Sequence, residues 1–200
     1  MTKLLRLDSS IFGNAGASSQ LNDQLVAYFS SRYPDLEVQH RDLAQQTLPH
    51  FSASFVGALG KSPEQRSQEE QAQVALADEL IRELREADLL VIGAPMYNFT
   101  IPTTLKTWMD YVARAGETFK YTSSGPVGLL RDTRVYINTS RGGLHRDQTS
   151  DGIVPLLKNF FALLGLTDVT VIYAEGLNLG DGSREQALSE AGQSINNLAA

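Results

Sequence analysis

The sequence of 200 residues contains no cysteine. This absence excludes disulfide bonds, zinc–thiolate sites, iron–sulfur clusters and a catalytic thiol. The three histidines, His40, His50 and His145, lie far apart without the spacing of metal ligands, so we predict no metal site. Positive charge is also scarce. With 17 Lys and Arg against 23 Asp and Glu the formal net charge is −6, which argues against a nucleic-acid partner.

Long apolar runs are missing as well. No run approaches the ~20 residues that a membrane-spanning helix requires, and the N-terminal MTKLLRLDSS reaches Asp8 too soon for a signal peptide. We therefore expect no membrane partner and a cytoplasmic location. No repeat or flexible linker divides the chain, and 42% of its residues are hydrophobic, which is enough for a full core. These features predict a single domain over residues 1–200.

Strand-like runs alternate with helix-like runs along the chain. The expected strands cover residues 3–8, 36–41, 88–94, 133–139 and 168–174, and residues 44–68 are the least regular part. This alternation predicts an α/β fold, a parallel sheet covered by helices on both faces. Five strands suit the doubly wound order 2-1-3-4-5, whose ligand crevice lies at the carboxyl ends of strands 1, 3 and 4. The loops after these strands are therefore the candidate site.

The first of these loops, residues 9–20, reads SSIFGNAGASSQ and opens a helix for which Ser18 or Ser19 is the expected cap. Backbone amides and hydroxyls at a helix N-terminus bind phosphate. The loop matches neither G-x-x-x-x-G-K-[ST] nor G-x-G-x-x-G, which disfavours nucleoside triphosphates and a Rossmann-type dinucleotide. The alternative for this loop is an ordinary strand-to-helix turn with a serine cap.

The second loop is unusually apolar. It lies between Pro95 and Pro102, which stiffen it, and it contains Met96, Tyr97, Asn98 and Phe99. These side chains offer a flat surface, and the backbone groups near Asn98 are expected to be free, which suits an aromatic ring system with polar edges. The alternative is that the side chains fill a core or a subunit interface.

The third loop contains Ser140, Arg141, Gly142 and Gly143. Two glycines after a strand allow a ligand to approach the backbone closely, although a turn with positive φ is the alternative. The predicted fold brings the three loops together, one suited to a phosphate and two to the edges of a planar heterocycle. FMN has both parts, so we predict an FMN site.

Residues 95–130, PMYNFTIPTTLKTWMDYVARAGETFKYTSSGPVGLL, closely resemble the signature region of the FMN-dependent NADH-azoreductases, members of the flavodoxin-like quinone reductase superfamily. TSRGG, LTDV at 166–169 and AEG at 174–176 also resemble that family, and the similarity covers nearly the whole chain. The resemblance implies a flavodoxin-like homodimer with non-covalent FMN at two sites near the interface. It also implies a ping-pong cycle in which NADH reduces the flavin and a quinone or azo compound then accepts two electrons.

Carried over by position, the resemblance assigns the phosphate to Ser10, Gly16, Ala17 and Ser18, one side of the ring to Met96, Tyr97, Asn98 and Phe99, and its other edge to Ser140, Arg141, Gly142 and Gly143. Many relatives have Ser-x-Ser in the phosphate loop, so Gly16 lacks a hydroxyl that they have.

Tyr121, His145 and Phe161 are candidates for the substrate wall, with core packing as the alternative for Phe161 and a surface position for His145. No side-chain nucleophile or acid–base pair is expected, because the flavin carries the hydride chemistry.

Two other functions fit a flavin site. One is a flavodoxin-like electron carrier and the other is an FMN-binding regulator without turnover. A carrier exposes the flavin edge and is usually monomeric, whereas the long apolar segment 95–130 favours a covered dimer site. The choice between NADH and NADPH stays open, because Lys61 and Arg66 either contact a dinucleotide phosphate or are simply solvated.

Overall fold

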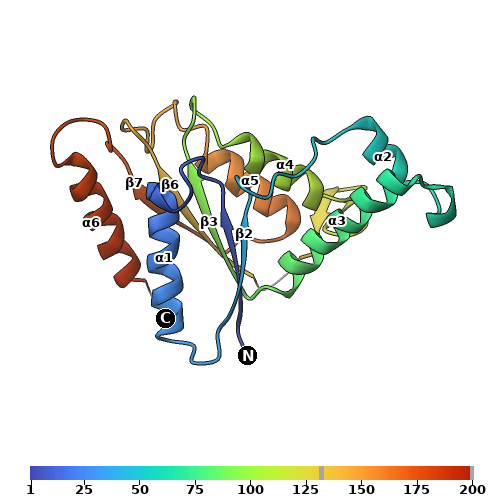
Figure 1. The fold of residues 1–200 in the computed structure, drawn as a ribbon, viewed down its shortest axis with the longest axis horizontal. Coiled ribbons are helices and arrows are strands. Elements are labelled where there is room, and N and C mark those ends of the chain that lie inside the picture. The colour runs from blue at the N-terminus through green and yellow to red at the C-terminus, as the bar shows by residue number, and fades with distance from the viewer. Residues whose placement is uncertain (131–132, 199–200) are drawn as a thin grey trace.

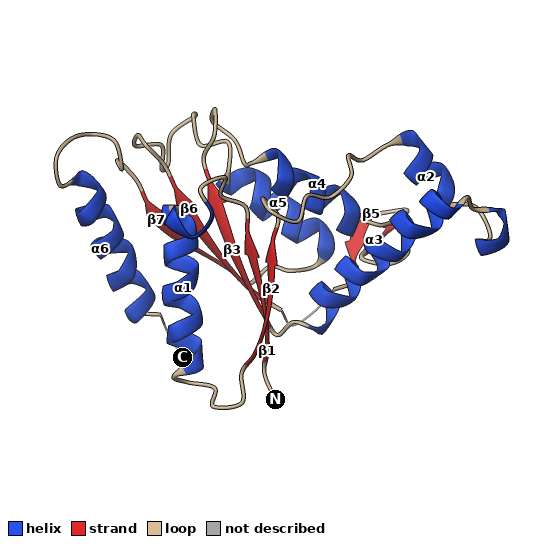
Figure 2. Cartoon of the chain, in the orientation of Figure 1, coloured by secondary structure: helices blue, strands red, loops and turns tan. Residues whose placement is uncertain are grey.

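The computed structural model describes residues 1–130 and 133–198 (Figures 1 and 2). Its centre is a parallel sheet of five strands in the order β2-β1-β3-β6-β7. The strands are β1 (Lys3–Asp8), β2 (Glu37–Asp42), β3 (Leu89–Pro95), β6 (Arg134–Ser140) and β7 (Val169–Ala174). Counted by the strands of this sheet alone, the order is 2-1-3-4-5, so the predicted fold is confirmed.

Helices cover both faces of the sheet. Figure 1 shows α1 (Ala17–Ser30) and α6 (Ser183–Asn196) on one side, with α3 (Gln68–Glu86), α4 (Thr103–Val112) and α5 (Val154–Leu164) on the other. β3 is buried along its whole length, which explains its continuous apolar sequence. Leu89 and Val91 pack in the core with α1 and α6, while Leu90 and Ile92 pack in the core with α3, α4 and α5.

Local sequence explains some helix ends but not the start of α1. Ser67 and Glu70 form a capping box at the start of α3, each side chain accepting from the other residue's amide. The N-cap of α1 is instead Gly16, which has no side chain. The expectation that Ser18 or Ser19 caps α1 was therefore wrong, because both lie inside its first turn.

The irregular residues 44–68 contain a short helix that the sequence pattern did not predict, α2 (Ala53–Leu59), capped by Ser52, followed by the 3-10 turn Pro63–Gln65. Residues 119–128 form an antiparallel hairpin of β4 (Phe119–Thr122) and β5 (Gly125–Gly128), separate from the main sheet. This hairpin contains Tyr121. None of the helices described is both long and apolar enough to span a membrane.

Candidate functional site at the carboxyl edge of the sheet

The three predicted loops meet at the carboxyl ends of β1, β3 and β6. The Tyr97 hydroxyl lies 3.3 Å from Ser10 Oγ and accepts a hydrogen bond of 3.2 Å from the Ile11 amide. The Met96 amide donates to the Ser140 carbonyl at 2.8 Å. The second loop is thus bonded to the first on one side and to the third on the other, and the predicted convergence is confirmed.

In the first loop, Gly16 and Ser10 depend on each other. Ser10 is 2% exposed, and its Oγ accepts from the Phe12 amide at 3.2 Å. A Cβ at position 16 would lie only 2.2 Å from Ser10 Oγ and 2.7 Å from Ser10 Cβ. The Ser10 hydroxyl therefore comes this close to the start of α1 because residue 16 has no side chain.

The start of α1 is suited to an anion. The first amides of any α-helix lack an acceptor within the helix, and here no side chain caps them. The hydroxyls of Ser18 and Ser19 are buried and have no hydrogen-bond partner among the described residues. Free amides, buried hydroxyls and the positive end of the helix dipole together fit a phosphate group.

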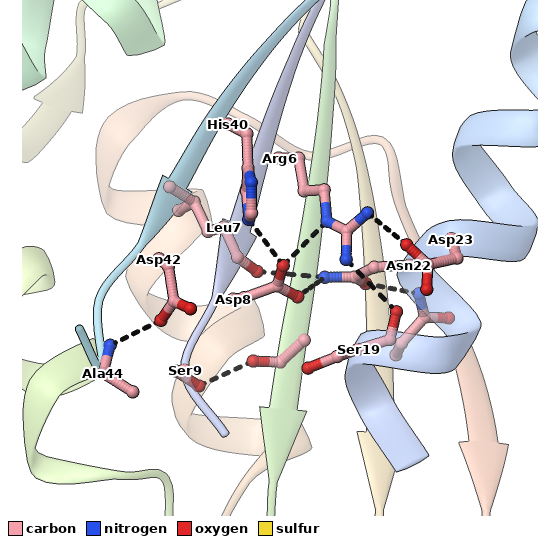
Figure 3. Close-up of polar contacts among 12 residues, drawn as sticks. Arg6, Leu7, Asp8, Ser9, Ser19, Asn22, Asp23, His40, Asp42 and Ala44 are labelled. Carbon is pink, nitrogen blue, oxygen red and sulfur yellow. Dashed lines mark hydrogen bonds and ion pairs between the residues drawn. The ribbon is translucent and has the colours of Figure 1, made fainter. Parts of the chain in front are cut away.

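A buried polar layer joins α1 to the sheet just below this loop (Figure 3). Asp8, 3% exposed, accepts from Asn22 Nδ2 at 2.7 Å and lies 2.7 Å from His40 Nε2. Asn22 in turn accepts from Asn138 on β6 at 2.7 Å. A Cβ at Gly93 would lie 3.0 Å from Asn22 Nδ2. Asn22 of α1 is thus bonded to β1 and to β6, the two strands that flank Gly93 on β3.

Arg6 completes this layer. It donates to Asp8 at 2.7 Å, to Asp23 at 2.5 Å and to the Ser19 carbonyl at 3.3 Å, so it bonds the first two turns of α1 to β1. Burial acts to lower the pKa of Arg6, but the hydrogen bonds and charges of Asp23 and Asp8 outweigh it and the pKa is raised. The guanidinium therefore stays charged and fixes the position of the N-terminus of α1 relative to the sheet.

The second loop is a strained turn with an exposed aromatic ring. Tyr97 and Thr100 exchange two backbone hydrogen bonds of 2.9 and 3.2 Å. Between them, Asn98 and Phe99 have positive φ angles of 50° and 68°, which is uncommon for a bulky side chain. Phe99 is 62% exposed, and its ring centroid lies 5.7 Å from that of His145, nearly perpendicular to it. The turn thus presents a flat apolar surface at the site.

Arg141 in the third loop is not available to a ligand as a cation. Its side chain is fully buried and is paired with Asp151 at 2.8 Å and with Glu175 at 3.2 Å. Its amide donates to the Ala174 carbonyl, and its carbonyl accepts from the Leu177 amide. The polar groups of Arg141 are therefore already bonded within the protein. Its place beside a cofactor stays a prediction from the sequence.

Gly142 and Gly143 do offer free backbone amides. Neither has a positive φ, so the alternative of a turn that requires one is wrong. Side chains crowd them instead, because a Cβ would lie 2.7 Å from Asn178 Nδ2 at position 142 and 2.9 Å from His145 Nε2 at position 143. Within the described part of the chain, neither amide donates to a backbone acceptor.

The three substrate-wall candidates lie in different places. His145 is beside Phe99, with its Nδ1 2.9 Å from Ser150 Oγ. Tyr121 is 76% exposed on the hairpin and lines a separate cavity of about 670 Å³ beside α2, α3 and α4. Phe161 is fully buried, because α5 packs its ring into the core of the fold, which agrees with the alternative of core packing.

Neither candidate for a dinucleotide phosphate is free. Lys61 pairs with Glu70 at 2.6 Å, and Arg66 donates to the carbonyls of Ala58 and Lys61. Over residues 1–130 and 133–198, no cluster of three or more His, Asp or Glu side chains could hold a metal ion.

Several residues of the site were missed at the level of sequence. They are polar residues at or near the ends of the central strands and the partners they bond: Asp8, Asn22, Asn138, Asp151 and Glu175. Asp8 and Asn138 carried a usable signal, since each interrupts an apolar strand near the edge where ligands bind. Asp151 and Glu175 gave no such signal, because their role depends on Arg141.

Comparison with known proteins confirms the resemblance seen in the sequence. The "FMN-dependent NADH:quinone oxidoreductase" of Saccharophagus degradans is 46% identical over 200 residues, covering 96% of this chain and 90% of that protein. The protein of the same name from Cellvibrio japonicus is 47% identical over 195 residues, covering 98% and 97%. The solved azoreductase of Bacillus anthracis superposes with a TM-score of 0.86 at 30% identity, covering 99% and 100%. A family described as having a flavodoxin-like fold matches residues 2–198, and the chain belongs to this family.

Proposed function

We propose that the protein is an FMN-dependent NADH:quinone oxidoreductase that also reduces azo compounds. The observation that carries this proposal is the bonded junction of three loops at the carboxyl edge, where Tyr97 joins the phosphate loop to the ring loop. The curated relatives that carry this enzyme name cover nearly the whole chain, which supports the same reaction here.

The phosphate of FMN would lie at the start of α1. Ser10, Gly16, Ala17 and Ser18 are the residues we assign to it. The buried Ser18 hydroxyl without a partner supports the assignment, since an acceptor is missing there. The Asp8 and Arg6 layer beneath the loop holds these donors in place before a ligand arrives, which reduces the ordering that binding requires.

The flavin ring would lie between the second and third loops. Met96, Tyr97, Asn98 and Phe99 would line one side, and Ser140, Gly142 and Gly143 the other edge. Bound FMN supplies the hydride acceptor and donor for the reaction. The residues themselves orient the ring and offer backbone donors to its polar edge.

We further propose a homodimer. Several large apolar side chains are exposed on loops near this edge: Ile11, Phe12, Phe99, Leu144 and Leu179. A contiguous apolar patch marks an interaction site, and a second copy of the chain would cover these side chains. Tyr121 on the hairpin stays a candidate for the substrate wall through such a contact. A single domain, a cytoplasmic location and the lack of nucleic-acid or membrane partners stay predictions from the sequence.

The test begins with FMN titration of the purified protein, followed by anaerobic addition of NADH or NADPH. We expect tight uptake of FMN, direct bleaching of the flavin by the nicotinamide, and turnover with a quinone or an azo dye. Parallel lines in double-reciprocal plots would support the ping-pong order. An electron carrier would bind FMN without direct two-electron reduction by NADH, and a regulator would bind it with negligible turnover. Failure to bind FMN would refute the proposal.

A further inference from the structure

We propose that Arg141, Asp151 and Glu175, here named the Arg141 clamp, are positioning residues that aim a row of backbone donors at the flavin. The inference rests on the proposed function for its ligand. It gives Glu175 of the AEG segment, described above only as a partner of Arg141, a role toward the ligand.

Glu175 holds the far end of the third loop. Its Oε1 accepts from the amides of His145 and Arg146, both at 2.8 Å, and lies 3.2 Å from Arg141 Nη1. One carboxylate oxygen therefore fixes the residues on both sides of Gly142–Leu144. Hydrogen bonds to an ionised group are stronger than neutral ones, so this short segment is held firmly at both ends.

Asp151 fixes the clamp to the next helix. Its Oδ1 accepts from Arg141 Nη2 at 2.8 Å and from the amides of Ile153 and Val154 at 3.1 Å each, at the start of α5. Arg141 Nε also lies 3.3 Å from Thr139 Oγ1. The guanidinium thus joins β6, β7 and α5 from a fully buried position.

The direction of the free amides follows from the carbonyls. The carbonyls of Arg141, Gly142 and Gly143 all accept hydrogen bonds from the segment after β7, from the amides of Leu177, Asn178 and Gly176 respectively. No cis peptide bond occurs in the described chain, and in a trans peptide the N–H points opposite to the C=O. The amides of Gly142, Gly143 and Leu144 are therefore directed away from residues 176–178, as one row.

Such a row matters chemically because it faces in one direction. Preorganised amides favour the state of a ligand that carries more negative charge, which for FMN is the reduced ring. Loosening the row should weaken the binding of reduced FMN more than that of oxidised FMN. Loss of one well-aligned hydrogen bond changes affinity by about tenfold. A tenfold loss for reduced FMN relative to oxidised FMN lowers a two-electron midpoint potential by about 30 mV.

The test is the midpoint potential of bound FMN in two variants. Glu175→Ala removes the acceptor, and we expect the potential to fall by about 30 mV. Glu175→Gln loses the same charge but keeps an acceptor oxygen, so we expect its potential to lie about 30 mV above that of Glu175→Ala. If Glu175 acted only as a nearby negative charge, both variants would raise the potential by similar amounts. That result, or no shift in either variant, would overturn the proposal.

Three controls keep the outcome clear. Glu69→Ala removes a charge from an exposed position on α3 and should leave the potential unchanged.

If E175A does not fold, as judged by circular dichroism, Arg141→Lys is used. It keeps the charge but loses the planar fork, so the same fall is expected, and an unchanged potential refutes the role. Hydrogen exchange of the amides of Leu177 and Asn178, which donate to the carbonyls of Arg141 and Gly142, can be measured without FMN. If the wild type bound no FMN, the proposed function would fail, yet faster exchange of these amides in E175A would still support the clamp and unchanged exchange would refute it.

Discussion

The close approach of Gly16 to Ser10 gives the sharpest test of the phosphate loop. Gly16→Ala adds a Cβ that would lie 2.2 Å from Ser10 Oγ, 2.7 Å from Ser10 Cβ and 3.1 Å from the Gly13 carbonyl oxygen. Carbon contacts are favourable only at about 3.5–4.0 Å. The backbone at Gly16 has φ −64° and ψ 136°, which alanine adopts freely, so backbone strain adds nothing to the penalty.

The magnitude follows from two opposing terms. Overpacking of a tight site costs about 1–3 kcal/mol, and the reduced entropy of the unfolded chain returns about 0.4–1 kcal/mol. We therefore expect Gly16→Ala to lower the free energy of unfolding by about 1–2 kcal/mol. Ser10 must also move away from the Tyr97 hydroxyl, which would raise the dissociation constant for FMN by about tenfold.

Urea unfolding of the FMN-free protein measures the first quantity and quenching of FMN fluorescence the second. Ser10→Gly removes both crowding atoms, so the double variant S10G/G16A should be more stable than the sum of the single changes predicts, with a coupling of about 1–2 kcal/mol. Gly57→Ala is the matched control, since nothing lies within 4 Å of its added Cβ. If G16A were as stable as G57A, or if the two changes were additive, the contact would not exist as described.

Three further predictions concern buried polar groups. Tyr97→Phe removes the hydroxyl that contacts Ser10, so FMN affinity should fall several-fold while stability falls by only about 1 kcal/mol, as titration and urea unfolding would show. Burial raises the pKa of the Tyr111 hydroxyl in the folded protein. The unfolded chain therefore loses the hydroxyl proton at a lower pH than the folded protein does. As a result, the contribution of Tyr111 to the free energy of unfolding is complete below pH ~10 and is lost above it. Tyr111→Phe should lessen that alkaline loss and leave stability at pH 7 equal or higher, because the hydroxyl is buried with no described partner; a large loss at pH 7 would contradict this. Asp8→Asn weakens the acceptor of Arg6 and should cost about 3 kcal/mol, measured by thermal unfolding; a loss under about 1 kcal/mol, the range of exposed ion pairs, would show that the buried layer is not ordered as described.

The sequence by itself determined the fold and the place of the site. The fully apolar β3 can only be a strand covered on both faces, and the alternation of strands with helices restricts the topology to a few doubly wound orders. Once that order is known, the loops after β1, β3 and β6 must share one edge. The short α2 was not predictable in this way, because seven residues are too few for a periodic pattern.

Tertiary structure alone decided what each residue does at that edge. Arg141 was predicted beside the cofactor, and only the folded chain shows that its guanidinium is bonded to Glu175, 34 positions away. Gly16 was described from the sequence only as lacking a hydroxyl that relatives have, but its missing side chain leaves the space that the Ser10 side chain occupies. Phe161, a candidate for the substrate wall, lies in the core. The physical reason is the same in each case. A local pattern reports the conformation of neighbouring residues, whereas burial, pairing and crowding depend on side chains that become neighbours only after the chain has folded.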